Sequence, residues 1–140
     1  MLRTPLLSLY IMLALMQPAG AEANDAPPAA FFAGDYVLVG RLQDGGDAYA
    51  GSAGIVAADD DMLTIERTVD GETVRETGRF VTPRPPGEGR VLHLSSADGA
   101  LVGSCLRTVD LDNDPRLTCL RAVAGTDPAE PGYEALFPAR

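Results

Sequence analysis

The sequence predicts an all-β protein, a small antiparallel meander of about seven or eight strands that closes into a β-barrel. From Asp35 onward, short β-rich runs alternate with turn residues, and no apolar pattern of helical period lasts longer than two turns. Glycines 51, 54, 78 and 103 lie inside these runs, where tight coiling of a strand disfavours larger side chains. Closure would remove the exposed edges of such a sheet, and a β-sandwich is the alternative.

The chain begins with the pattern of a secretory signal peptide, which we assign to residues 1–21. Arg3 precedes an apolar run from Leu6 to Met16, and cleavage fits after Ala21, in Ala19-Gly20-Ala21, and nearly as well after Ala23, in Ala21-Glu22-Ala23. The apolar run is too short to span a bilayer, and no cysteine follows to accept a lipid. We therefore expect a periplasmic or secreted product without a membrane span.

Residues 22–30 lack periodicity and read as a flexible tether, so a single barrel-like domain is expected over residues 31–140, with Phe31 and Phe32 as its first apolar anchor. At the other end of the chain, Tyr133, Leu136 and Phe137 have the spacing of one helical turn, which we expect to plug an end of the barrel. The expected strands are Asp35–Arg41, Tyr49–Ala57, Met62–Val69, Glu72–Val81, Arg90–Ser95, Ala100–Val109 and Arg116–Ala124.

The turns are better defined than the strands. A two-residue Asp-Gly connection at 70–71 fits a type I′ hairpin, because both residues tolerate positive φ angles. That register places Glu66 opposite Arg75 and Thr68 opposite Thr73, which are favourable cross-strand pairs. A second Asp-Gly pair at 98–99 predicts another hairpin.

Charge and composition exclude several classes of function. The formal net charge is −9, all basic residues apart from the one histidine are arginine, and removal of residues 1–21 brings the charge to −10. Such a field repels phosphate backbones, so we expect no nucleic acid partner. With one histidine and two cysteines the chain offers no zinc set, and we expect no cofactor.

Both cysteines belong to the exported part of the chain, where oxidation is favoured, and we predict a Cys105–Cys119 disulfide. Between them, the acidic residues have the 1, 3, 5 spacing of a calcium loop, yet Pro115 and Arg121 stand where that loop needs Gly and Glu. We interpret the segment as a polar turn; the candidate ligands of a weak calcium site would be Asp110, Asp112, Asn113 and Asp114.

Charged side chains on strand faces are the candidate ligand-binding residues. In the 70–71 hairpin, Arg67 lies beside Val74 and diagonal to Glu76, so we expect an Arg67–Glu76 ion pair inside or at the mouth of the barrel. Arg107 and Arg121 share the Cys105 face by alternation, and the sequence does not decide whether that face is inward.

No catalytic constellation is evident. His93 alternates with Leu92 and Leu94, which predicts an outward-facing strand histidine, and Ser52 lacks the first glycine and the helix of a nucleophile elbow. We therefore expect a protein that is not an enzyme.

The predicted barrel resembles lipocalin-like and avidin-like architectures at the level of the fold. We expect an exported, non-catalytic binding protein that holds a small apolar or amphipathic ligand inside the barrel. The alternative is a periplasmic interaction protein or enzyme inhibitor, acting on an envelope protein through its loops.

Overall fold

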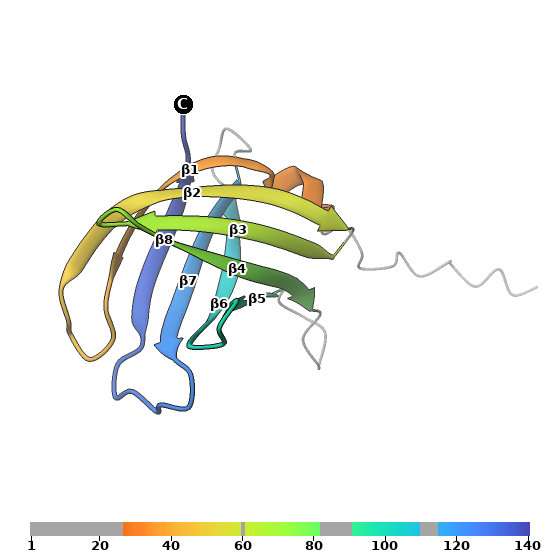
Figure 1. The fold of residues 1–140 in the computed structure, drawn as a ribbon. Helices are drawn as coiled ribbons and strands as arrows, with labels where there is room; N and C mark the ends of the chain where they lie inside the picture. The colour runs from red at the N-terminus through yellow and green to blue at the C-terminus, as the bar shows by residue number, and fades with distance from the viewer. Residues whose placement is uncertain (1–26, 60, 82–90, 110–114) are drawn as a thin grey trace, which may run out of the picture.

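A computed structural model describes residues 27–59, 61–81, 91–109 and 115–140, without the side chains of residues 108 and 109. Its main feature is a closed antiparallel barrel in which each strand pairs with its neighbours in chain order and the last pairs with the first. The predicted fold class is confirmed, and Figure 1 shows the strands wrapping around one interior. The elements are the 3-10 turn η1 (Ala29–Phe32) and the strands β1 (Gly34–Arg41), β2 (Ala48–Asp59), β3 (Met62–Val69), β4 (Glu72–Val81), β5 (Val91–Ser96), β6 (Leu101–Val109), β7 (Pro115–Val123) and β8 (Gly132–Pro138).

The expected register of the β3–β4 hairpin is confirmed. Glu66 lies opposite Arg75 and Thr68 opposite Thr73, and the two threonine hydroxyl oxygens are 2.7 Å apart. The turn residues Asp70 and Gly71 have φ angles of 51° and 81°, as a type I′ turn requires. The local sequence therefore predicts both the turn and the register of this hairpin.

The C-terminal segment corrects one expectation. Tyr133, Leu136 and Phe137 do not form a helical turn: they belong to β8, which pairs with both β7 and β1. Leu136 faces the core with Gly132 and Glu134, while Tyr133 and Phe137 face outward. Pairing with two neighbouring strands satisfies the backbone of β8 on both sides, which a single helical turn could not do.

The two ends of the barrel differ. Because the strands form a meander, the β1–β2, β3–β4, β5–β6 and β7–β8 connections share one end, which we call the mouth. At the opposite end η1 buries Phe32 against Phe80, with ring centroids 5.0 Å apart, and the Tyr36 hydroxyl donates a hydrogen bond to the Phe32 carbonyl at 2.9 Å. An apolar core containing Leu38, Leu92 and Leu117 fills the interior beyond η1.

Of the four glycines that the sequence places inside strands, two lie where a side chain would collide with its neighbours. A Cβ on Gly78 would come within 2.8 Å of Leu92 Cδ1, and one on Gly51 would overlap the Thr68 carbonyl oxygen. Gly103 is nearly as tight, at 3.0 Å from the Leu120 carbonyl oxygen, whereas Gly54 has only the Asp35 carboxylate at 3.8 Å. Close packing therefore explains glycine at 51, 78 and 103, but not at 54.

No helix among the described residues is both long and apolar enough to cross a membrane.

Candidate functional site: a buried network of arginine and glutamate

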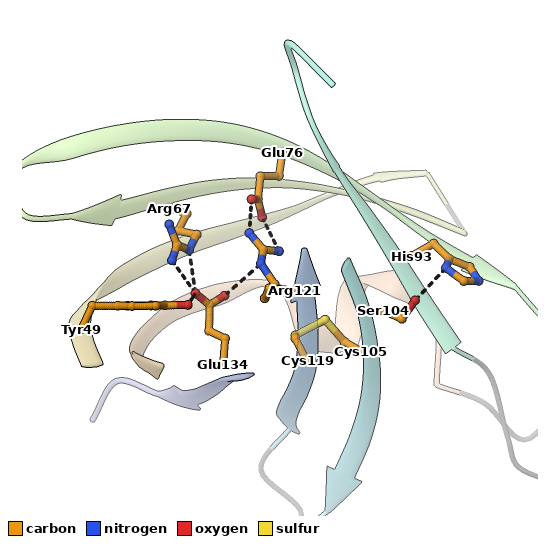
Figure 2. Close-up of a disulfide and its surroundings, with 9 residues drawn as sticks. All are labelled: Tyr49, Arg67, Glu76, His93, Ser104, Cys105, Cys119, Arg121 and Glu134. Carbon is orange, nitrogen blue, oxygen red and sulfur yellow. Dashed lines mark hydrogen bonds and ion pairs between the residues drawn. A yellow bond between two sulfur atoms is a disulfide. The ribbon is translucent and has the colours of Figure 1, made fainter. Parts of the chain in front are cut away.

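Five polar side chains meet inside the barrel on its mouth side. They come from β2, β3, β4, β7 and β8, and Figure 2 shows them pointing toward one another across the interior. We call them the Arg–Glu network: Tyr49, Arg67, Glu76, Arg121 and Glu134. Each is on the inward face of its strand by alternation with buried core residues.

Glu134 is the centre of the network. Its Oε2 accepts hydrogen bonds from the Tyr49 hydroxyl at 2.9 Å and from Arg67 Nε at 2.7 Å, and Arg67 Nη2 is also 2.7 Å away. The guanidinium of Arg67 lies 5.0 Å from the centroid of the Tyr49 ring. Charge, hydrogen bonding and cation–π contact thus fix the three side chains relative to one another.

Arg121 connects Glu134 to the second carboxylate. Its Nη1 donates to Glu76 Oε2 at 3.1 Å and its Nη2 to Glu76 Oε1, a bidentate pairing of guanidinium with carboxylate. Its Nε lies 4.0 Å from Glu134 Oε1. The network contains two cations and two anions, so its charge is balanced.

Two glycines give the network room. Gly40 lies between Tyr49 on β2 and Glu134 on β8, and the ring of Tyr49 covers the place where its side chain would be. Gly103, opposite Arg121, has Cδ of that arginine 3.1 Å from the position of a Cβ. Without side chains at 40 and 103, Tyr49 and Arg121 lean across the neighbouring strands toward the carboxylates.

Burial of the network is deep but uneven. The side chains of Glu76 and Glu134 are each 2 % exposed, while those of Arg121 and Arg67 are 9 % and 12 % exposed. Among the described residues, every buried side-chain nitrogen and oxygen has a hydrogen-bond partner. Removing one charge from such a cluster leaves its partner unpaired in a low-dielectric interior, which is strongly destabilising.

The environment also shifts two pKa values. Burial and the neighbouring Glu134 carboxylate raise the pKa of the Tyr49 phenol, so Tyr49 is a neutral hydrogen-bond donor at neutral pH. For Arg67, burial acts to lower the pKa, but the hydrogen bond and the negative charge of Glu134 outweigh it and raise the pKa overall.

Four apolar side chains form a partial apolar collar on the mouth side of the network. They lie on the inward-facing alternation of their strands, between the network residues and the turns: Val69 on β3, Val74 on β4, Leu101 on β6 and Val123 on β7, the last of which is 44 % exposed. Leu101 and Val123 are cross-strand partners, and Val69 packs against the core. These apolar side chains therefore lie nearer to the turns of the mouth than the network does.

The structure gathers three of the four predicted binding residues, in a different pairing. Arg67, Glu76 and Arg121 belong to the network, but Arg67 pairs with Glu134 and Glu76 with Arg121, in place of the expected Arg67–Glu76 pair. The Cys105 face is inward, yet Arg107 is exposed. Arg107 lies opposite Leu117, and the disulfide pair lies between this position and Arg121 along the two strands. Arg107 therefore does not join the network.

Tyr49 and Glu134 are the two network members that the sequence analysis does not predict. Glu134 lies in the segment expected to form a helical turn, although Gly132, Glu134 and Leu136 show the period of two expected of a strand face. Tyr49 alternates with Gly51, Ala53 and Ile55, which would have placed it inward. A carboxylate on an inward strand face requires a cationic partner, so the alternation around Glu134 is the sequence signal that would predict its pairing with an arginine.

The remaining predicted residues lie away from the network. The Cys105–Cys119 disulfide is confirmed between directly opposed, fully buried positions of β6 and β7. His93 faces outward, and its Nδ1 is 3.1 Å from the Ser104 hydroxyl on the adjacent strand, as Figure 2 shows. The calcium candidates Asp110, Asp112, Asn113 and Asp114 lie outside the described residues. Within the described ranges, no three His, Cys, Asp or Glu side chains form a metal-holding group.

One side of the outer wall is apolar. The adjacent strands β7, β8 and β1 carry five outward-facing apolar or aromatic side chains that are between 38 % and 55 % exposed: Leu120, Tyr133, Phe137, Val37 and Val39. The outward faces of β3 and β4 instead carry charged residues such as Glu66, Arg75 and Arg79. We refer to the first surface as the outer apolar face.

Comparison with known proteins identifies the fold and no family. No family model matches the chain, and no curated protein matches it. Among solved structures, a de novo designed fluorescence-activating β-barrel matches with a TM-score of 0.52 and 16 % identity, over 80 % of this chain and 96 % of that one. A redesigned β-barrel matches with a TM-score of 0.53 and 12 % identity, over 81 % of this chain and 96 % of its own. At these identities the similarity concerns the fold alone.

Proposed function

We propose that this protein is an exported, non-catalytic binding protein that takes a small amphipathic molecule at the mouth of its barrel. The observation that carries the proposal is the Arg–Glu network, five polar side chains buried together beneath an apolar collar. A binding site typically combines apolar walls with a few convergent polar groups that orient the ligand. The disulfide is compatible with export, since it forms in oxidising compartments.

The packing of the barrel restricts where a ligand fits. An eight-stranded barrel is just wide enough either for its own side chains or for one small ligand. Toward η1 the interior is filled by Phe32, Phe80 and the leucine core. We therefore assign the ligand to the mouth, with its polar group toward the network and its apolar part against the collar.

The first test is native mass spectrometry of the protein purified gently from the exporting host. A reproducible added mass that is lost under denaturing conditions supports the proposal. Backbone amide NMR then locates the site, using octan-1-ol and octanoate as probes. We expect shifts of residues in the collar and the adjacent turns, and none near η1. The absence of both a retained mass and any probe-induced shift would overturn the proposed function.

The outer apolar face favours a second candidate function, an interaction protein that binds a basic partner through β7, β8 and β1. Apolar surface of this kind commonly marks a protein contact, and the net charge of −9 selects for a basic partner. The contact surface of this candidate is therefore a strand surface and not the loops expected from the sequence.

The two candidates separate in a cross-linking experiment in the exporting host. For an interaction protein, we expect a cross-linked species that is lost in a Leu120→Ser, Tyr133→Ser double variant and weakened by salt. A matched Thr77→Ser control on the polar side of the barrel should retain it. Identical cross-links in all three proteins would contradict this candidate.

A further inference from the structure

We infer that the ligand is an amphiphile with a singly charged anionic head, of the carboxylate class, which binds the outer edges of the Arg67 and Arg121 guanidiniums. The inference rests on the proposed function and names the chemistry of the molecule taken at the same site.

The first argument is which part of the network a ligand can reach. The carboxylates of Glu76 and Glu134 belong to side chains only 2 % exposed, enclosed by Tyr49, Arg67 and Arg121. The two arginine side chains keep 12 % and 9 % of their surface accessible. Although the network is neutral as a whole, its arginine side chains are more accessible than its glutamate side chains, and Tyr49 is also partly exposed.

The second argument is hydrogen-bonding capacity. A guanidinium carries five N–H donors in a fixed planar fork and no acceptor. Arg67 directs Nε and Nη2 to Glu134, and Arg121 directs Nη1 and Nη2 to Glu76, which uses only part of the donors. Carboxylate oxygens match the remaining fork geometry, whereas an ammonium group would add a third cation beside the two guanidiniums.

The third argument limits the charge of the head group. Two arginines already balance two glutamates, and burial raises the pKa of Tyr49 so that it adds no charge at neutral pH. One further negative charge can share the two guanidiniums, but a doubly charged phosphate would leave a larger uncompensated charge close to Glu134 and Glu76. The site therefore favours a monoanion.

The collar determines the rest of the molecule. Val69, Val74, Leu101 and Val123 lie between the network and the turns, so an apolar segment that extends from an anion on the arginines toward the mouth would contact these side chains. Burial of that segment contributes roughly 0.8 kcal/mol for each methylene group. A medium-length monocarboxylate is the simplest molecule with both parts.

The test compares three probes with the same tail: octanoate, octan-1-ol and octylammonium. Isothermal titration of the mature protein at neutral pH should give octanoate an affinity at least tenfold higher than octan-1-ol, with octylammonium the weakest. The preference for octanoate should decline as the pH falls through the pKa of its own carboxyl group. Equal binding of octan-1-ol or octylammonium would overturn the inference while leaving the proposed function intact. No binding of any probe would overturn the inference and, where no mass is retained in the native spectrum either, the proposed function as well.

A variant pair tests the residues. Arg67→Gln should reduce the ratio of octanoate to octan-1-ol affinity, and Arg75→Gln, on the outer wall with an exposed partner, should preserve it. The ratio is used because a general weakening of the fold lowers both affinities together. Should Arg67→Gln fail to fold, the arginine Nε–H resonances of the unaltered protein serve instead. Octanoate should shift those of Arg67 and Arg121 more than that of Arg75, and equal or absent shifts would overturn the inference.

Discussion

Glu134 holds more interior polar contacts than any other residue of the network. It accepts from Tyr49 and Arg67 and lies 4.0 Å from Arg121 Nε, with a side chain 2 % exposed. By contrast, Glu66 pairs with Arg75 on the outer wall, where the side chains are 54 % and 67 % exposed. The two carboxylates allow the same chemical change to be compared inside and outside the barrel.

We predict that Glu134→Gln lowers the free energy of unfolding by about 3 to 5 kcal/mol, because it leaves buried cations without their counter-charge. The control Glu66→Gln should change the free energy of unfolding by less than about 1 kcal/mol, as expected for an exposed pair. Urea unfolding of both variants measures the difference. Equal effects would contradict the central role of Glu134.

Deprotonation of Tyr49 lowers the stability of the fold at alkaline pH. The folded state holds its proton above the ordinary pKa of 10.0, so the phenol stabilises the fold fully below that pH, and the stabilisation is lost as pH rises through the folded pKa. We predict that Tyr49→Phe shows a smaller loss of stability with pH in the alkaline range. Urea unfolding at a series of pH values checks this, and identical pH profiles for the two proteins would contradict it.

At this scale the sequence identified three members of the network, Arg67, Glu76 and Arg121, from strand alternation alone. It did not reveal their partners, because β3 and β8, like β4 and β7, are not neighbours in the sheet and meet only across the closed interior. Local register predicts contacts along the wall of a barrel. Contacts across its axis depend on closure.

At the level of the strands, Gly40 on β1 lies opposite both Tyr49 on β2 and Glu134 on β8. Because Gly40 has no side chain, the Tyr49 ring can lie over it. A Cβ on Gly40 would lie 2.5 Å from Oη of Tyr49, and closer still to its Cζ. The Tyr49 ring extends over Gly40 to reach Glu134, so this ring fills the space that a side chain at position 40 would need.

We predict that Gly40→Ala destabilises the fold by about 1 to 3 kcal/mol, the usual cost of overpacking, and displaces the Tyr49 ring from Glu134. Gly54→Ala is the matched control, since its nearest neighbour would be 3.8 Å away. Thermal unfolding and tyrosine side-chain NMR measure both effects. An unchanged Tyr49 resonance in Gly40→Ala would contradict the prediction.

The strands also show what sequence patterns determine and what they leave open. Met62–Val69 and Glu72–Val81 are the ranges expected from the Asp-Gly turn, because that hairpin is specified locally. The strand Gly132–Pro138 was missed, because three apolar residues at helical spacing are also compatible with an alternating strand. Pairing with β7 and β1 decides between a helical turn and a strand for this segment.

For the whole molecule, one intact-mass measurement reports both removal of the signal peptide and oxidation of the two cysteines. We predict that the protein isolated from its host begins at Glu22 or Asn24 and has lost the two hydrogens of Cys105 and Cys119. In the chain-entropy model, reduction should lower the free energy of unfolding by roughly 3 kcal/mol. Intact mass and unfolding with and without reductant test this. A product that retains Met1 and free thiols would contradict it.

Pairing of the first strand with the last has a consequence for protein engineering. Tyr36 lies opposite Pro138, and the amide of Ala139 donates to the Asp35 carbonyl at 2.8 Å, so the two ends of the barrel's chain are neighbours at the end away from the mouth. A short linker could join them, and the chain could be reopened in the exposed turn between Asp70 and Gly71. The barrel should therefore tolerate circular permutation, with every strand pair kept and only the order of synthesis changed.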